Sequence, residues 1–402
     1  MAGNGLPTEM RRRLYAFARG IASPFPDARR RRFLRDRIPG LLISGHVHLR
    51  KGARAISPGD ADSHGAEKRL GNHLGGGHWD MSPVATELLT RSAGLVTDDP
   101  LLTAGRADLN EMSARTLEGL GRAPDGSDPD KRIVPGSRVF GADGRVGRWQ
   151  PFPRLLEPPR TCAGAPTGED AAISADVLQI HQATAGKGTG LLDRGFDRDE
   201  LMPPWLRRRG ASLIRQRGDR HVVLAGGRTL AETAVAAALQ PVAGPRRWPR
   251  GGYTTGCAVR LPEAPDRAFL RVVQWRRPHA EPLRLLVSPA ARRPGRRAAW
   301  FVKASHRRWG VEGATGGIKQ RLHREDVLVR SWMSIRRRLW LVAWVFFWLD
   351  LRGAGGDDGL RQALLDHPRR LPKEVTYLFD WIARQISRLL HPKPLFGLAS
   401  RR

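Results

Sequence analysis

The charged residues between positions 305 and 322 have the types and the spacing that phosphate chemistry uses. The segment reads SHRRWGVEGATGGIKQRL. In a helix that turns about 100° per residue, offsets of about four, seven and eleven residues return to the same face. Four side chains have these offsets: Arg308, Glu312, Thr315 and Lys319. A carboxylate between two cations suits work on a phosphate group, although the same pattern arises from i,i+4 ion pairs on a solvated face.

The spacing Arg-x3-Glu-x6-Lys resembles the signature helix of the insertion-sequence transposases that are named for a Tyr-Arg-Glu-Lys motif. The sequence that follows, SWMSIRRRLWLVAWVFFWL, is similar to the buried helix after the catalytic Glu of this family. The family has a Tyr three residues before the Arg, where this chain has Ser305. The resemblance covers about residues 45–350. It implies a DDE transposase, with Glu312 as the last of its catalytic carboxylates.

A second similarity lies in the segment LLDRGF at residues 191–196. The family has its second acidic residue in an Asp-Arg-Gly-Phe turn at the end of a strand, with a helix and another strand after it. Asp193 fits that position, because a helical pattern around 199–209 and the apolar run ASLIRQ follow. Alone, Asp-Arg-Gly also fits an ordinary turn, since Asp and Gly are common turn formers. The resemblance makes Asp193 the second catalytic residue.

The first acidic residue is expected within residues 107–127, ADLNEMSARTLEGLGRAPDGS. This segment resembles the family's Asp-Leu-Thr-Asp block and the Glu-Gly-Leu and Asp-Gly-Ser groups after it. Asp108 is the matching residue. Asp98 and Asp99 are alternatives, because they closely follow an apolar pair. The stretch that must deliver Asp108 reads LLTAGRAD, in which Gly105 and the Arg after it weaken a buried strand.

Carboxylates on separate elements suit a centre for two Mg²⁺ ions, with Mn²⁺ as a substitute. Mg²⁺ prefers hard oxygen ligands, and ions about 3.5–4 Å apart need carboxylates that bridge and flank them. The resemblance implies that Asp108, Asp193 and Glu312 are both catalytic residues and metal ligands. The expected reaction is cut-and-paste transposition, in which water and then a DNA 3′-hydroxyl attack phosphodiester bonds at terminal inverted repeats.

Cations beside the carboxylates are expected to bind DNA. Arg308 and Lys319 share the face of Glu312, and Arg194 directly follows Asp193. Arg can hold a phosphate through two hydrogen bonds. The family uses its equivalents of the two helix cations to grip the transposon end, so the same role is implied here.

The composition favours a polyanionic partner. The 402 residues contain 69 Lys and Arg against 39 Asp and Glu, a formal net charge of +30. Such an excess repels itself unless a partner neutralises it, and nucleic-acid phosphate does so with release of counterions. A genome that encodes Arg often would give the same excess without any ligand. With the resemblance, the charge implies double-stranded DNA as partner and a homodimer in the synaptic complex.

The sequence predicts neither export nor a membrane span. The longest apolar run, LWLVAWVFFWL at residues 339–349, is about half of the roughly 20 residues that cross a bilayer, and it indicates a buried core helix. The N-terminus has no apolar region of a secretory signal, so a cytoplasmic protein at the nucleoid is expected. Cys162 and Cys257 are isolated, which supports neither a disulfide framework nor a zinc site.

Helical patterns and breaks alternate over residues 1–92, which predicts a basic helical DNA-binding region. Helices are expected at 9–19, 30–42, 67–74 and 83–89. Residues 57–77 are rich in Gly, Asp and His, and this composition indicates turns between helices.

Residues 93–350 are expected to form the catalytic domain, of α/β class. A helix at 172–182 and short apolar runs between Gly and Pro indicate an α/β core, and further runs between about 219 and 300 indicate a β-rich insertion. The strand-like runs lie at 138–140, 152–156, 211–216, 268–275 and 283–287. The resemblance implies a ribonuclease-H-like core, in which two Asp from strand ends and a Glu from a helix converge.

A C-terminal helical region is expected at residues 351–402, after a helix at 327–351. Apolar residues at helical spacing between 375 and 389 indicate core or dimer packing.

Two other classes of function stay open. A decayed transposase would bind DNA without cutting it. Ser305 favours this class, and so do Gly313, Gly316 and Gly317, each of which costs a helix roughly 1 kcal/mol relative to Ala. A general nuclease would cut DNA that carries no repeat ends.

Overall fold

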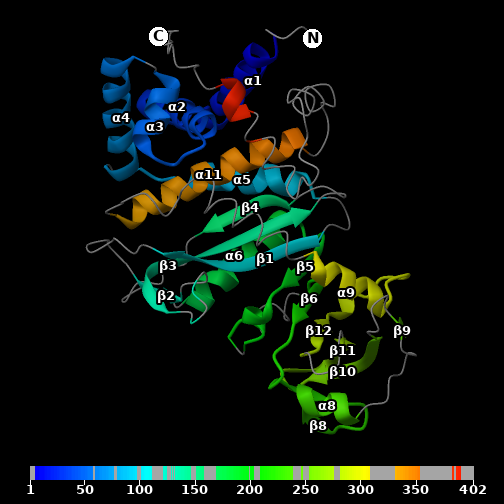
Figure 1. Cartoon of the computed structure of the whole chain (residues 1–402). Coiled ribbons are helices and arrows are strands. Elements are labelled where there is room, and N and C mark those ends of the chain that lie inside the picture. Colours follow the sequence, from blue (N-terminus) through cyan, green and yellow to red (C-terminus); the bar gives the residue numbers. More distant parts are fainter. Residues whose placement is uncertain are drawn as a thin grey trace, which may run out of the picture. The chain divides into compact units, whose positions relative to one another are not determined.

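The computed structural model of the chain describes residues 5–57, 59–76, 79–96, 101–110, 121–124, 128, 130, 132–145, 151–157, 169–198, 200–202, 209–238, 246–247, 253–275, 281–307, 331–353, 383 and 386–390. The protein is a mixed α/β molecule, drawn in Figure 1. It divides into two compact units. Unit 1 comprises Met1–Leu88, Leu109–Gly136 and Gly313–Arg402, and unit 2 comprises Leu89–Asp108 and Ser137–Glu312.

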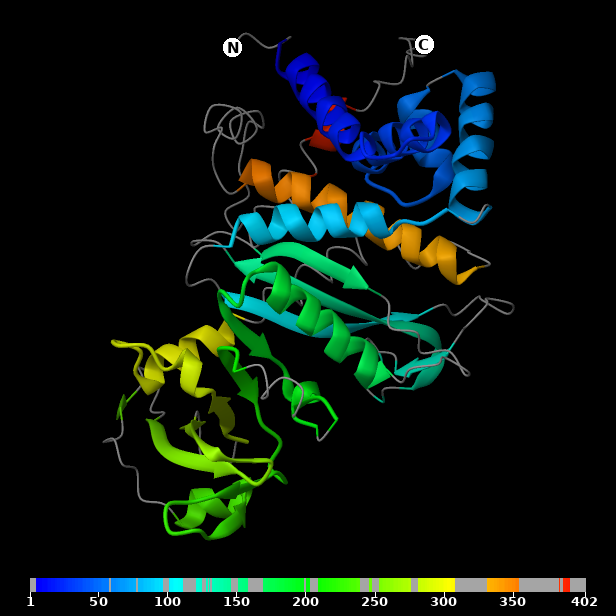
Figure 2. The ribbon, with the colours of Figure 1, turned by 180° about the vertical axis from the view of Figure 1, so that it is seen from behind.

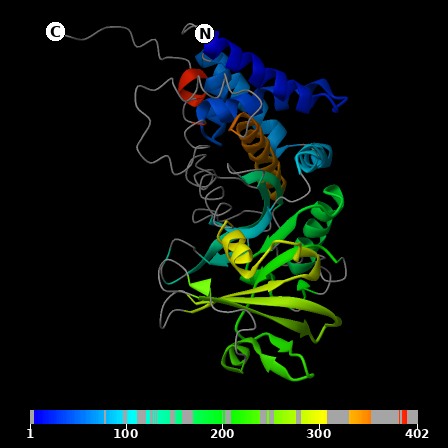
Figure 3. The ribbon, with the colours of Figure 1, turned by 90° about the vertical axis from the view of Figure 1, so that its right-hand side faces the viewer.

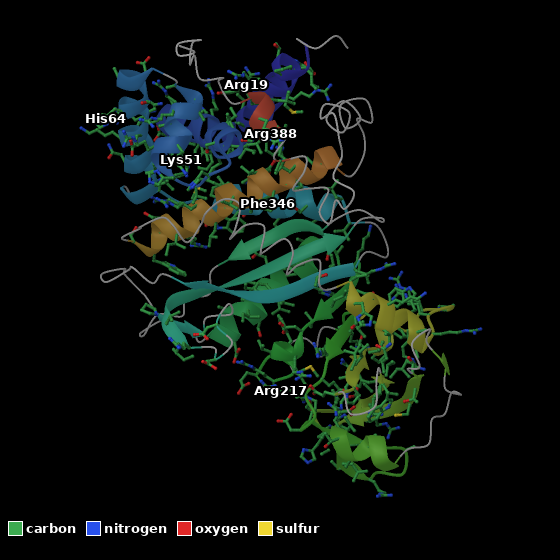
Figure 4. All side chains as sticks on the ribbon, viewed as in Figure 1. Arg19, Lys51, His64, Arg217, Phe346 and Arg388 are labelled. Atoms are coloured by element: carbon green, nitrogen blue, oxygen red, sulfur yellow. The ribbon has the colours of Figure 1, made fainter. Side chains whose placement is uncertain are left out.

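The N-terminal part of unit 1 is helical. Its helices are α1 (Gly5–Ala22), α2 (Ala28–Ser44), α3 (Leu49–Ile56), α4 (Asp60–Gly75) and the first part of α5 (Ser82–Gly94). α2 packs against α1, α3 and α4. Figure 4 marks basic side chains on three of these helices: Arg19 on α1, Lys51 on α3 and His64 on α4. The four helices expected in this region are confirmed, and α3 is an addition to them.

The helix expected at 67–74 lies within α4, but the interpretation of the residues before it as turns is wrong, because α4 already begins at Asp60. Ala66, Leu70 and Leu74 recur at helical spacing in this helix, and all three are buried. Burial of that apolar face stabilises the helix more than the weak helix propensities of Gly and Asp destabilise it.

The apolar run at residues 339–349 is a core helix, as predicted. It belongs to α11 (Trp332–Gly353), and every residue of the run is buried within unit 1. The indole nitrogen of Trp344 donates a hydrogen bond of 3.2 Å to the carbonyl of Val84, and the Phe17 ring meets Trp344 edge-on. α11 also packs against α2 and α4. Within the described ranges, no helix has the length and apolar character that a membrane crossing needs.

Only residues 383 and 386–389 are described in the C-terminal pattern between 375 and 389, and these are helical. Residues 327–330, at the start of the helix expected at 327–351, lie outside the described residues.

Unit 2 is built on a mixed sheet. Its strands are β1 (Leu101–Asn110), β3 (Ile133–Arg145), β4 (Pro151–Glu157), β5 (Thr189–Leu192), β6 (Ser212–Arg215), β7 (His221–Val223), β8 (Thr229–Ala231), β9 (Arg246–Arg247), β10 (Tyr253–Leu261), β11 (Ala264–Trp275) and β12 (Leu283–Val287). They follow the order β3-β1-β5-β6-β12-β11-β10-β7-β8, with β4 paired to β3 and β9 paired to β10. The first residues of β3, which belong to unit 1, pair with β2 (Gly121–Pro124).

The sheet contains a parallel part and an antiparallel part. β1, β5 and β6 are parallel neighbours. The antiparallel pairs β6–β12, β12–β11 and β11–β10 continue the sheet, and Figure 3 shows β10 and β11 as a long hairpin. The strand-like runs predicted from the sequence coincide with β3, β4, β6, β11 and β12.

Helices cover the sheet of unit 2. α6 (Glu169–Ala183), which contains the helix predicted at 172–182, lies across one face of β1, β3 and β4 (Figure 2). α9 (Ala298–His306) packs against β6, β10, β11 and β12. The smaller helices are η1 (Arg194–Phe196), α8 (Glu232–Ala238) and η2 (Pro289–Ala291).

One hydrophobic core joins the two parts of this sheet. Leu101 and Leu191 come from the parallel strands, Val272 and Leu285 come from the antiparallel strands, and Phe301 comes from α9. All five side chains are buried in the same cluster. The antiparallel strands are therefore an extension of the sheet and share its core.

Candidate active site

The carboxyl end of β5 carries Asp193. β5 lies between the parallel strands β1 and β6, with Leu192 opposite Ala104 on one side and Ile214 on the other. Asp193 is the next residue after Leu192, so it lies at the point where β5 ends. In open sheets with parallel strands, ligands and reacting groups gather at the carboxyl ends of the strands.

The turn after β5 fixes the carboxylate of Asp193. Asp193 is the N-cap of η1, and its Oδ1 accepts a hydrogen bond of 2.8 Å from the backbone N–H of Gly195. The side chain is half-buried. Among the residues that the structure describes, no hydrogen bond reaches Oδ2. The sequence Asp-Arg-Gly-Phe thus forms a strand-end turn, with one carboxylate oxygen used for the turn and the other available.

Asp108 lies on the neighbouring strand but further along it. The backbone of Asp108 belongs to β1, so the stretch with Gly105 does form a strand. Asp108 is four residues beyond Ala104, whereas Asp193 is one residue beyond Leu192, the partner of Ala104. The offset of about three residues corresponds to roughly 10 Å along the strands at about 3.3 Å per residue. The two strands are therefore neighbours, but Asp108 and Asp193 are not opposite each other in the register of the sheet.

The third carboxylate and its neighbours are not among the described residues. The candidate site residues that lie outside the described part of the chain are Asp98, Asp99, Arg308, Glu312 and Lys319. Of the segment expected as a helix at 305–322, only residues 305–307 are described. Ser305 and His306 are the last residues of α9, and Arg307 is its C-cap, so a helix ends at the point where the expected helix begins.

Arg194 already has a partner at the surface. Its Nη2 lies 2.9 Å from Oε1 of Glu281, and the two side chains are 40% and 54% exposed. Arg284 also reaches Glu281, at 3.2 Å. The hydrogen bond from Arg194 lowers the pKa of Glu281 below its ordinary value. An anion can bind Arg194 only if it replaces Glu281, and sequence reasoning missed this ion pair because the two residues are distant along the chain.

Asp197, which sequence reasoning missed, anchors the same turn. Its Oδ2 accepts a hydrogen bond of 2.6 Å from the backbone N–H of Arg217, marked in Figure 4, and its Oδ1 pairs with Arg220. Arg220 also pairs with Glu263 at 2.5 Å. Burial raises the pKa of Asp197, and the hydrogen bond from Arg217 opposes this effect. With both oxygens engaged, Asp197 holds η1 to the segment after β6 and is not available as a metal ligand.

The donor chemistry at the ends of β1 and β5 fits a hard cation such as Mg²⁺, since both candidate ligands are carboxylates. Within the described ranges, His, Cys, Asp and Glu side chains form no group of three or more that could hold a metal ion. The side chains of Asp108 and Glu312 are not among those described. Cys257 is a buried free thiol, and Cys162 lies outside the described residues.

Comparison with known proteins adds no relative. No protein-family model and no curated protein matches the chain. We therefore infer the function from the residues at the carboxyl ends of the parallel strands and from the sequence pattern.

Proposed function

We propose that the protein is a DDE transposase that cuts double-stranded DNA at terminal inverted repeats and joins the ends to a target. The observation that carries the proposal is the position of Asp193 at the carboxyl end of β5, beside the parallel strand that contains Asp108. Two acidic residues on neighbouring parallel strands are the arrangement that the Tyr-Arg-Glu-Lys resemblance implies. In the proposal, Glu312 completes the set.

The order of elements in unit 2 supports a ribonuclease-H-like core as part of this proposal. β4 pairs with β3, and β3 lies beside β1. α6 comes next in the chain, and β5 and β6 then extend the sheet parallel to β1. Such a core supplies two Asp from neighbouring strands. In the proposal, the β-rich segment between β6 and α9 is the insertion into this core.

The residues of the chain would act by holding charge in fixed positions. The N–H of Gly195 orients the Asp193 carboxylate, and the contacts of Asp197 with Arg217 and Arg220 hold the turn that carries it. Asp108, Asp193 and Glu312 would bind two Mg²⁺ ions, which supply activation of the attacking hydroxyl and stabilisation of the departing oxygen. Positioning of this kind provides most of the catalysis in phosphoryl transfer.

The cations of the proposed site would bind the DNA backbone. Arg308 and Lys319 would hold phosphates next to Glu312, as the resemblance implies. Arg194 would exchange its ion pair with Glu281 for a phosphate, which is feasible because an exposed ion pair contributes only about 0–1 kcal/mol.

A DNA-binding protein without cleavage activity is the second candidate. The offset of about three residues between Asp108 and Asp193 along their strands favours it, because a shared metal pair requires the two carboxylates to meet. Ser305, at the position of the family's Tyr, favours it too.

The two candidates differ in Mg²⁺-dependent nicking of duplex DNA that carries the inverted repeats flanking the coding region. We expect the wild-type protein to nick and Asp193→Asn to be slower by about 100-fold or more, since a preorganised charge at the reacting phosphate is lost. Asn keeps an oxygen that accepts the hydrogen bond from Gly195, so the turn is preserved. Asp62→Asn is the matched control, because Asp62 is exposed on α4 of unit 1 and takes no part in the turn that carries Asp193.

Equal nicking by Asp193→Asn and the control would remove Asp193 from the active site. A wild-type protein that binds this DNA but does not nick it would favour the second candidate. Nicking of a duplex with scrambled ends at the same rate would instead identify a general nuclease.

A further inference from the structure

A cationic cavity lies at the other end of β6. Its volume is about 540 Å³. Side chains before β6, at the start of β11 and after β12 line it, among them Arg209, Asp266, Arg267, Phe269, Ser288 and Arg292. Arg209 precedes β6, whereas Asp193 is level with Arg215, the last residue of β6. The cavity and the candidate active site are therefore separated by the length of this strand.

The charge of the cavity wall is positive and partly uncompensated. Three arginines face one carboxylate, Asp266, which lies 3.8 Å from Arg267. Arg209 and Arg292 are exposed, and neither guanidinium forms an ion pair or hydrogen bond with any residue in the described part of the chain. Two cations are thus available to an anionic ligand at this position.

The backbone at Arg209 is strained. Its φ is 53°, in the left-handed region that costs a non-glycine residue roughly 1–2 kcal/mol. Hydrogen bonds hold the chain there: Ser288 donates from Oγ to the carbonyl of Gly210 at 3.0 Å and accepts from the N–H of Ser212 at 2.8 Å. Glycine would fit this backbone better, and strained residues of this kind concentrate at binding sites.

We propose that this cavity binds the phosphate backbone of duplex DNA as a contact separate from the active site. Arg209 and Arg292 supply planar donor groups that can each bind a phosphate through two hydrogen bonds. The volume lies in the range of pockets that hold small ligands, which suits a few linked sugar–phosphate units. The contact positions the duplex without reading its sequence. The phosphate chemistry follows from the cavity, and the choice of duplex DNA rests on the proposed function.

The test measures the affinity of the full chain for a fluorescent duplex of arbitrary sequence, without Mg²⁺ and over a series of salt concentrations. Arg209→Gly removes a cation and relieves the strained φ, so this variant should be at least as stable as the wild type. For Arg209→Gly and for Arg292→Gln we expect binding to weaken roughly threefold to tenfold, with a salt slope lower by about 1. Arg228→Gln is the matched control, since Arg228 is exposed in the turn between β7 and β8.

Three outcomes decide the proposal. It is overturned if both cavity variants bind the duplex as tightly as Arg228→Gln. It is also overturned if they lose only the binding of inorganic phosphate, because the ligand would then be a small anion. Weaker duplex binding by both variants supports it, even if the wild-type protein never nicks DNA, and in that case the proposed enzymatic function fails while the cavity contact stands.

Discussion

Buried arginines have different partners in the two units. In unit 2, Arg271 pairs with Glu232 at 2.6 Å, and the two side chains are 3% and 0% exposed. In unit 1, Arg337 is also buried, and it donates at 3.0–3.2 Å to backbone carbonyls, those of His73, Leu74, Gly76 and Trp79. Several of these carbonyls belong to the last turn of α4, where the backbone carbonyls of a helix have no hydrogen-bond donor within the helix. One arginine thus depends on a group that titrates, and the other on groups that do not.

The largest effect is expected for Arg271→Met. This change leaves Glu232 buried without its cation, and loss of one partner of a buried pair costs about 3–5 kcal/mol of unfolding free energy at neutral pH. Urea denaturation followed by tryptophan fluorescence measures the loss. The double variant Arg271→Met/Glu232→Leu should regain most of it. A single variant as stable as the wild type would show that the pair contributes nothing.

The same variant should recover stability in acid. Burial raises the pKa of Glu232, and removal of Arg271 takes away the opposing charge. In the variant, the folded state holds the Glu232 proton more tightly than the unfolded state does. The protonated Glu232 therefore stabilises the fold below its unfolded-state pKa, and this stabilisation is lost as pH rises through its folded-state pKa. The deficit of Arg271→Met should therefore be smallest at about pH 4.5 and largest at neutral pH. A deficit that is constant with pH would contradict this reading of the pair.

Arg337→Met is expected to have the next largest effect. The carbonyls at the end of α4 lose their donor, and buried acceptors without partners cost about 1–3 kcal/mol each when water cannot replace the donor. We expect a net loss of about 2–3 kcal/mol in the same denaturation experiment. No carboxylate is involved, so the loss should change little with pH; a slightly smaller loss is expected in acid, because burial and, to a lesser extent, the Arg337 charge lower the pKa of His73. Arg35→Met, at an exposed position of α2, is the control.

The smallest effect is expected for Arg37→Met. Arg37 is fully buried in α2 and donates from Nη2 to the carbonyl of Val47 at 2.5 Å, while its Nε and Nη1 have no hydrogen-bond partner in the described part of the chain. Burial lowers the pKa of this guanidinium to about 9. The cost of burying the charge offsets the single hydrogen bond, so the unfolding free energy should change by less than about 1 kcal/mol.

The pH dependence of Arg37→Met gives a second measurement. The unfolded state holds the Arg37 proton more tightly than the folded state, so the wild type gains stability as pH rises above about 9. The variant should lack this gain. A loss as large as that of Arg337→Met would mean that a buried arginine with one carbonyl is as stabilising as one with several.

Elements with strong apolar patterns could be predicted from the sequence. The run at 339–349 and the helix at 172–182 are long and regular, and they lie within α11 and α6. α4 was predicted only in its second half, at 67–74, because the Gly and Asp residues of its first half are typical of turns. The spacing of Ala66, Leu70 and Leu74 is helical. It favours a helix over turns only because these side chains are buried against other helices, which the sequence does not show.

The candidate site was predictable only in its local part. The sequence around Asp193 indicated a turn at a strand end, and the N-cap of η1 is such a turn. The register that sets Asp108 about three residues beyond Asp193 depends on pairing between distant segments, which periodicity does not encode. The partners of Arg194 and Asp197 are also distant along the chain. The place of Glu312 in the site stays a prediction.

The pairing of β12 with β6 limits how the chain can be shortened. Leu285 and Val287 of β12 lie opposite Arg215 and Leu213 of β6 in the antiparallel ladder, so the residues between β6 and α9 complete the sheet. A truncated protein without them would expose a row of unsatisfied amide and carbonyl groups on β6, which is a template for aggregation. The segment is for this reason an obligatory part of the folding unit, and it cannot be removed as a detachable module.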